Sequence, residues 1–259
     1  MRPVILRYDS LPSTNTEATS QALRGAKEGL CVVALEQTAG RGRQQRFWAS
    51  PKGAGLYLSI VLRPSMEMVV WPLITLMTAL AVGDALLDAC GLQTDIKWPN
   101  DLLVDGRKVC GILTETVETD QGRAAIVGIG VNLNTNALPE ELRVVATSVE
   151  EVTGTAPDSE ALLRRLLLSF SQRYAALHQS PGAEEMLKEW SSRSSYSDGA
   201  CVRISLEDDI VEGVTRGLAS DGALRVETND GEIRLVRAGD VAAQSGAPTK
   251  GRLYNDFKR

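Results

Sequence analysis

The stretch Gly40-Arg41-Gly42-Arg43, which leads on to Arg46-Phe47-Trp48, is the most informative part of this chain. It follows the apolar run Cys31-Val32-Val33-Ala34-Leu35, which predicts a buried strand over residues 31–37. Glycines let a backbone approach a ligand closely, and arginines present charged, forked donors that match carboxylate and phosphate oxygens. A strand that ends in such a loop predicts a binding site for an anionic small molecule, although a Gly-Arg pair alone is also typical of a solvated turn.

Length and composition indicate an ordinary globular protein. The 259 residues suffice for one large domain, or for a large and a small one, and 43% apolar with 24% charged residues is typical. A net charge of -5 disfavours a general nucleic-acid binder but leaves room for a local basic site. The start of the chain reaches Arg7 and Asp9 too soon for an export signal. The 4 cysteines form no C-x-x-C pair, which favours a reducing cytoplasm over a zinc site or a disulfide framework.

The longest apolar window, residues 69–87, contains Thr75, Thr78, Gly83 and Asp84, so we expect no membrane span. Because it is apolar on most sides, the window predicts a largely buried helix, which begins near Pro72 and ends at Gly91. The single histidine, His178, falls near the end of a later predicted helix. It is expected at the surface, so histidine-based nucleophilic catalysis is not expected.

The first three quarters of the chain mix strands and helices. Clean alternation predicts a half-buried strand over 55–63, with Tyr57, Ser59, Val61 and Arg63 on its exposed face. The other predictions are a strand at 4–9, a helix at 14–24 with a capping box formed by Thr14 and Glu17, strands at 94–98, 108–116 and 123–133, a hairpin turn at Asp105-Gly106, and helices from about 158 to 177 and over 183–192.

The pattern changes from Asp198 onward. Short strands are predicted at 201–206, 210–217, 222–228 and 231–237, separated by turn residues, which is typical of a small barrel. The serine-rich segment 191–197 therefore marks a domain boundary. We expect one domain over residues 1–195, a second over 196–245, and a polar tail over 246–259 that is disordered.

Three further segments carry polar groups where binding residues gather. Ser13-Thr14-Asn15 stands at a helix N-terminus, where it serves either a ligand or simple capping. In Lys97-Trp98-Pro99-Asn100-Asp101, proline enforces extended geometry, so Lys97 either points into a pocket or lies on an edge strand. The glycines of Gly128-Ile129-Gly130-Val131-Asn132 indicate a close approach to the backbone, or a bulge. The sequence holds neither a P-loop nor a complete G-x-G-x-x-G between a strand and a helix.

The order of these segments resembles the biotin protein ligase family, also called biotin–[acetyl-CoA-carboxylase] ligases. With Gln37-Thr38-Ala39 and Gly111-Ile112-Leu113, the resemblance spans residues 6–240. It implies an α+β fold: a mixed or antiparallel central sheet with flanking helices, like class II synthetases, followed by a small SH3-like β-barrel. The chain begins directly at the catalytic part, so the resemblance is to the ligase-only class, and no DNA binding is expected. After Arg43, Gln44-Gln45 replaces the further arginine or glycine of many relatives.

The resemblance implies that biotin and MgATP form biotinyl-5′-AMP, and that biotin then passes to one lysine of a biotin carboxyl carrier domain. Lys97 and Arg43 are the expected catalytic cations, which neutralise charge as a carboxylate attacks the α-phosphate. The expected biotin-binding residues are Ser13, Thr14, Asn15, Gln37, Arg41, Gly42, Arg43 and Lys97. The expected nucleotide-binding residues are Arg43, Trp48 and Asn132. The magnesium ligands stay open, with Asp101 as one option.

Two further expectations, one about the loop and one about the central sheet, complete this hypothesis. A segment such as 38–52 can fold over the ligand and shield the labile mixed anhydride from water. Family members often dimerise through the central sheet, which allows a homodimer for this chain. The alternatives are a lipoate or octanoate ligase or transferase of the same fold, a DNA-contacting sensor of biotinyl-AMP, and an inactive adaptor. The Gly-Arg-Gly-Arg loop and the C-terminal barrel favour biotin over lipoate.

Overall fold

A computed structural model describes residues 2–134 and 140–243 of the chain. Within them, a seven-stranded sheet has the order β1-β2-β3-β7-β6-β5-β4. Only β1 and β2 pair in parallel, so the predicted mixed sheet is confirmed. Its strands are β1 (Val4–Tyr8), β2 (Leu30–Ala34), β3 (Gly55–Leu62), β4 (Asp95–Lys97), β5 (Asp101–Val104), β6 (Arg107–Thr119) and β7 (Gly122–Asn132).

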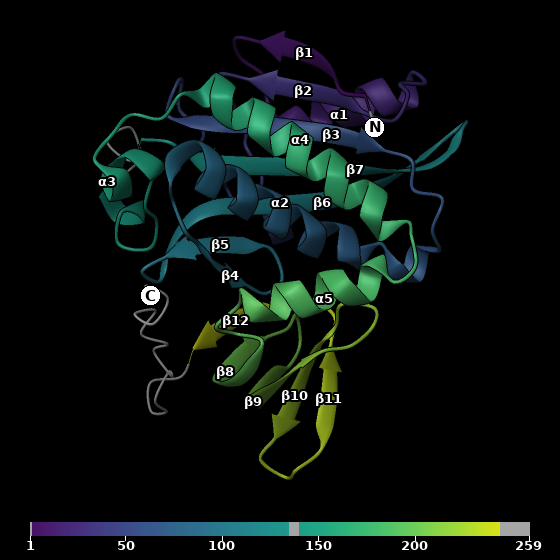
Figure 1. The fold of residues 1–259 in the computed structure, drawn as a ribbon, viewed down its shortest axis with the longest axis vertical. Helices are drawn as coiled ribbons and strands as arrows, with labels where there is room; N and C mark the ends of the chain where they lie inside the picture. The colour runs from purple at the N-terminus through teal and green to yellow at the C-terminus, as the bar shows by residue number, and fades with distance from the viewer. Residues whose placement is uncertain (1, 135–139, 244–259) are drawn as a thin grey trace, which may run out of the picture.

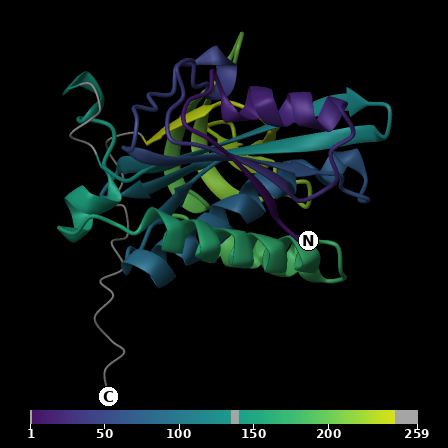
Figure 2. The same cartoon turned by 90° about the horizontal axis from the view of Figure 1, so that it is seen from above.

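Helices cover both faces of this sheet (Figures 1 and 2). The long helices α2 (Pro72–Cys90) and α4 (Ser159–Leu177) pack together on one face, and α1 (Thr14–Leu23) lies on the other. Helix α5 (Gly182–Ser192) joins α2 and α4 to the C-terminal part, and the short helix α3 (Val149–Thr153) was not predicted. The hairpin between β5 and β6 turns at Asp105 and Gly106, both with positive φ, as predicted.

Helix α2 is the centre of the hydrophobic core. Together with Met68–Val70 it is long and apolar enough to cross a membrane, so the sequence-based view that it is too polar was wrong. Of its most apolar window, 67% is buried inside the protein, between the sheet and α4. Burial on nearly every side therefore explains why this helix has no polar stripe.

Two local predictions, one about β3 and one about the start of α1, were wrong. Strand β3 is buried on both faces rather than one, since Tyr57, Ser59 and Val61 face the α1 side and are covered. No capping box forms at Thr14: the N-cap is Ser13, whose side chain makes no capping hydrogen bond. The Thr14 backbone N–H donates instead to the Gln37 side chain. The helix start is thus tied to the strand-end residue that precedes the Gly-Arg loop.

A second, antiparallel sheet follows α5. Among the described residues it has five strands in the order β11-β10-β9-β8-β12, which is consistent with an SH3-like domain. It packs on the larger domain through the Trp98 indole, which donates to the Gly222 carbonyl at 3.1 Å. The strands are β8 (Asp198–Ser205), β9 (Ile210–Leu218), β10 (Leu224–Thr228), β11 (Ile233–Val236) and β12 (Asp240–Ala243), of which β12 was not predicted. The tail expected over 246–259 lies outside the described residues.

Candidate active site

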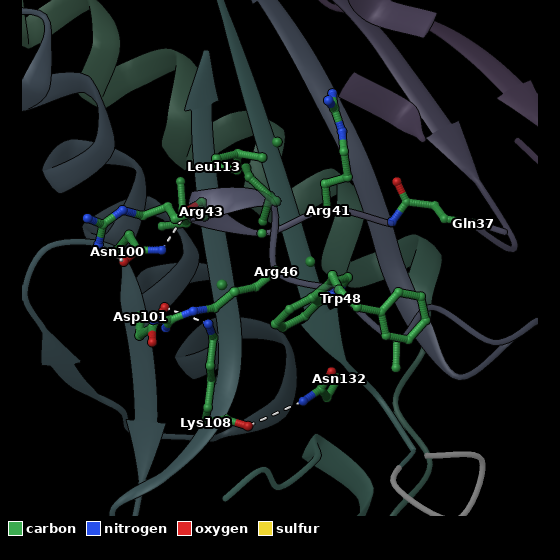
Figure 3. Close-up of a pocket in the computed structure, with 18 of the residues that line it drawn as sticks. Gln37, Arg41, Arg43, Arg46, Trp48, Asn100, Asp101, Lys108, Leu113 and Asn132 are labelled. Carbon is green, nitrogen blue, oxygen red and sulfur yellow. Dashed lines mark hydrogen bonds and ion pairs between the residues drawn. The ribbon is translucent and has the colours of Figure 1, made fainter. Parts of the chain in front are cut away.

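A cavity of about 340 Å³ opens where the start of α1, the first half of β6, the end of β7 and the C-terminal sheet come together (Figure 3). The segment of residues 38–52, here called the flap, runs across it. Nine of the residues predicted to bind ligands line this cavity: Ser13, Thr14, Asn15, Gln37, Arg41, Gly42, Arg43, Trp48 and Asn132. The fold therefore gathers segments that lie more than a hundred residues apart in the sequence.

Lys97 is the exception among the expected site residues, because the structure does not bring it to the cavity. It is not among the described residues that line the cavity. It ends β4, the edge strand of the sheet, one strand beyond Asp101 on β5, which does line the cavity. The edge-strand alternative that the sequence left open describes Lys97 correctly.

Lys108, and not Lys97, is the lysine among the described residues that line the cavity. Its Nζ lies 2.7 Å from Asp101 Oδ1 and 5.0 Å from the centre of the Trp48 ring. A register shift in β5–β6 pairing, just before Leu103 meets Lys108, accompanies this placement. The sequence offered one clue to this role, namely that Lys108 is a cation directly before the apolar run Val109–Cys110 in a strand that reaches the pocket.

At one end of the cavity, neutral polar groups form a buried cluster. The Gln37 carbonyl oxygen accepts from the Thr14 backbone N–H at 2.8 Å, and its amide donates to Ser50 at 2.8 Å. The Ser59 hydroxyl lies 2.8 Å from the Thr14 hydroxyl and 2.6 Å from Asn15 Oδ1. Sequence reasoning missed Ser50 and Ser59, because a lone serine carries no signal until the fold buries it. Such a cluster suits a ligand with several donors and acceptors.

At the other end, cations surround the space beneath the flap. Arg43 donates to the Asn100 side chain at 3.2 Å and to the Gly239 carbonyl at 3.1 Å. Burial lowers the pKa of the Arg43 guanidinium, while Asp240 and Asp101 act in the opposite direction. Arg46 pairs with Asp240, so both arginines tie the flap to the C-terminal sheet. This end can neutralise an anion such as a phosphate.

Glycines on neighbouring strands make room for the flap. Trp48 lies against Gly111 and Gly130, which pair with each other across β6 and β7. The Trp48 indole N–H is buried without a hydrogen-bond partner among the described residues, and the same holds for Arg41 Nε. Buried donors of this kind normally have a partner. Both are therefore candidates for contact with a bound ligand.

The substitution Gly130→Ala is expected to raise the KM for the nucleotide about tenfold. The reason is that moving the Trp48 side chain, which covers the site, should weaken nucleotide binding by about 1.4 kcal/mol. A Cβ there would lie 2.5 Å from Trp48 Nε1, so the indole has to move. The control is Gly83→Ala in α2, where the nearest atom is 3.4 Å away. Steady-state kinetics would check this. Equal KM values for the two variants would contradict the role of Trp48.

Comparisons with known proteins agree with this geometry. Residues 8–132 match the Biotin/lipoate A/B protein ligase family, and residues 199–242 match the Biotin protein ligase C terminal domain. The bifunctional ligase/repressor BirA of Bacillus subtilis is 38% identical, over 92% of this chain and 73% of its own length. The biotin–[acetyl-CoA-carboxylase] ligase of Mycobacterium tuberculosis is 34% identical, over 88% and 85%. A biotin protein ligase from Aquifex aeolicus, solved with biotin and ATP, has a TM-score of 0.82 at 28% identity, covering 93% and 99%.

The fold and the cavity define a ligase that activates a small carboxylic acid with a nucleotide. The match to the C-terminal domain of biotin ligases, and relatives named for biotin, favour biotin over the lipoate alternative. The chain belongs to the biotin protein ligase family.

Proposed function

We propose that this protein condenses biotin with ATP to biotinyl-5′-AMP and pyrophosphate, and then transfers biotin to a lysine of a carrier protein. The observation that carries the proposal is the division of one cavity into a neutral polar end and a cationic end. Biotin has a polar ring at one end and a carboxylate at the other. A ring held near residues 13–15 directs its carboxylate toward Arg43 and Lys108.

In the first step, the biotin carboxylate attacks the α-phosphorus, an O–P bond forms, and the bond to pyrophosphate breaks. Two anions have to approach each other, so fixed cations lower the barrier most. Arg43 and Lys108 hold these positions, and Trp48 covers the adduct against water. The expected contact of Asn132 with the nucleotide stays a prediction. The Asn132 amide donates to the backbone carbonyls of Lys108 and Thr147. It therefore holds the start of β6 close to the segment that precedes α3.

Magnesium would accompany ATP. Within the described residues, no group of three or more His, Cys, Asp or Glu side chains could hold a metal ion alone. Magnesium in nucleotide sites is usually held by one or two carboxylates together with phosphate oxygens. Asp101, which lines the cavity, fits that smaller demand and would supply a carboxylate ligand to the ion. Bound magnesium would neutralise phosphate charge.

In the second step, the amine of the carrier lysine attacks the acyl carbon, and AMP leaves. The partner we propose is the biotin carboxyl carrier domain of a biotin-dependent carboxylase. The homodimer, the lack of DNA binding and the cytoplasmic location stay predictions.

The test is to mix the protein with biotin, MgATP and a carrier domain, and to measure the mass of the carrier. The expected result is the gain of one biotinyl group on one lysine, dependent on ATP. The same assay with lipoate or octanoate should give no product. Modification by lipoate in place of biotin would contradict the proposal.

The contact between the flap and the C-terminal sheet gives a smaller expected effect. Asp240→Asn removes the partner of Arg46. Because exposed ion pairs typically contribute about 0.2–1 kcal/mol, the KM for ATP should rise by about 1.4- to fivefold. Asp209→Asn, which breaks the exposed pair with Arg234, is the matched control. If both variants had the same KM for ATP, the flap would not depend on this contact.

A further inference from the structure

A chain of hydrogen bonds runs beneath the neutral end of the cavity and includes two residues, Glu115 and Ser59, that contact no ligand in the proposal above. Glu115 Oε2, on β6, accepts from the Asn15 amide at 2.6 Å. The Asn15 oxygen lies 2.6 Å from the Ser59 hydroxyl, which lies 2.8 Å from the Thr14 hydroxyl. Ser59 is fully buried, and Asn15 and Thr14 are 3% and 4% exposed. Bulk water therefore does not take part in the hydrogen bonds between Asn15, Ser59 and Thr14, whereas Glu115 is 34% exposed and also lies 3.5 Å from Arg41 Nη2.

The direction of each bond follows from which groups can donate. A carboxylate only accepts, and so does the Leu113 carbonyl, which lies 3.3 Å from the same Asn15 nitrogen. The Asn15 amide nitrogen must therefore face Glu115, and its oxygen must face Ser59. The Asn15 oxygen can only accept, so the single proton of the Ser59 hydroxyl is directed to it. The contact between Ser59 and Thr14 then uses the proton of Thr14.

The Gln37 oxygen, 3.1 Å from the Thr14 hydroxyl, does not need that proton, because it already accepts from the Thr14 backbone N–H. With its proton directed inward, the Thr14 hydroxyl has only lone pairs left for a ligand. Thr14 lines the cavity. It can therefore accept a hydrogen bond from a ligand N–H, but it cannot donate one.

We propose that Glu115 is a positioning residue, which acts through Asn15 and Ser59 to make the Thr14 hydroxyl an acceptor for a ring N–H of the substrate. The inference rests on the proposed binding of the biotin ring near residues 13–15. It identifies the recognised ligand group as a cyclic urea N–H. A ligand with an ether-type oxygen in place of that N–H would set its lone pairs against those of the Thr14 hydroxyl.

The test compares biotin with its two cyclic carbamate analogues, in which one or the other ring N–H is replaced by oxygen. Binding to the whole protein is measured by calorimetry. The wild type should bind biotin about 10- to 100-fold more tightly than the carbamate altered at the Thr14 side, the range expected for one unmade buried hydrogen bond. In Glu115→Gln, the side chain can present an N–H as well as an oxygen to Asn15, so only the Leu113 carbonyl still favours the native direction and the bonds of the chain are free to reverse in part of the molecules. The preference should then fall to about threefold or less.

Ser59→Ala interrupts the same chain without touching Glu115 or Arg41 and should also lower the preference. Glu115→Asp keeps a group that only accepts, so it should retain the preference, and it serves if Glu115→Gln does not fold. Glu118→Gln, on the same strand but exposed and paired with Arg123, is the control with no change. If the Gln and Ala variants bind both ligands more weakly by the same factor, Glu115 has a merely structural role and the inference is wrong. A wild type that binds biotin without discriminating also overturns it, whereas a wild type that does not bind biotin contradicts the proposed function itself.

Discussion

Replacing Lys108 with alanine is expected to slow the formation of biotinyl-AMP by about 10²- to 10³-fold, the usual cost of removing one group that stabilises transition-state charge. The Lys108 ammonium is fixed by Asp101 at 2.7 Å and by the face of Trp48. No other lysine lies among the described residues that line the cavity. Biotin-dependent exchange of pyrophosphate into ATP measures this step directly.

The matched control for Lys108→Ala is Lys97→Ala. Sequence alone assigned the catalytic ammonium to Lys97, but the fold puts Lys97 on the edge strand β4. We expect Lys97→Ala to keep the exchange rate within about twofold, the range of a surface substitution. A large loss in Lys97→Ala together with a small loss in Lys108→Ala would restore the sequence-based assignment.

Arg43→Ala is expected to lower the same rate by about 10²-fold or more and to raise the KM for ATP. Arg43 is the flap residue that reaches both the Asn100 side chain and the Gly239 carbonyl, so it orders the flap as well as carrying charge. Arg43→Lys should restore only part of the rate, because a compact ammonium does not reproduce the planar donor geometry of a guanidinium. Steady-state kinetics in both substrates separates the two effects.

The control for Arg43 is Arg216→Ala on β9, an arginine that pairs with Glu227 on the C-terminal sheet. It should keep the wild-type rate and KM values. Full recovery of activity by Arg43→Lys would mean that charge alone matters, and the proposed ordering of the flap would then be wrong.

Much of the site could be predicted from sequence because its residues stand next to strong local patterns. The Gly-Arg flap follows the apolar strand β2, and Thr14 follows a cap-like serine at the start of α1. Both therefore lie where the end of a strand meets the start of a helix. The double glycine of β7 was expected to admit a close neighbour, and the structure shows Asn15 against Gly128 and Trp48 against Gly130. These inferences needed only local geometry.

The remaining features depend on pairing between distant strands. Lys97 and Lys108 are both lysines next to apolar strand residues, and only the strand order β7-β6-β5-β4 decides which one reaches the cavity. The half-buried pattern of β3 was misleading, because α1 covers the face that carries Ser59. Asp240 lies on β12, a strand too short to stand out in the sequence, and reaches the flap only because β12 pairs with β8.

The most direct test of the central claim is a crystal structure of the protein with biotin and a non-hydrolysable ATP analogue. The account predicts that the biotin ring lies on Thr14 and Asn15, that its carboxylate faces the α-phosphate between Arg43 and Lys108, and that residues 38–52 close over both. A complex in which Arg43 and Lys108 point away from the carboxylate and the phosphate would contradict it.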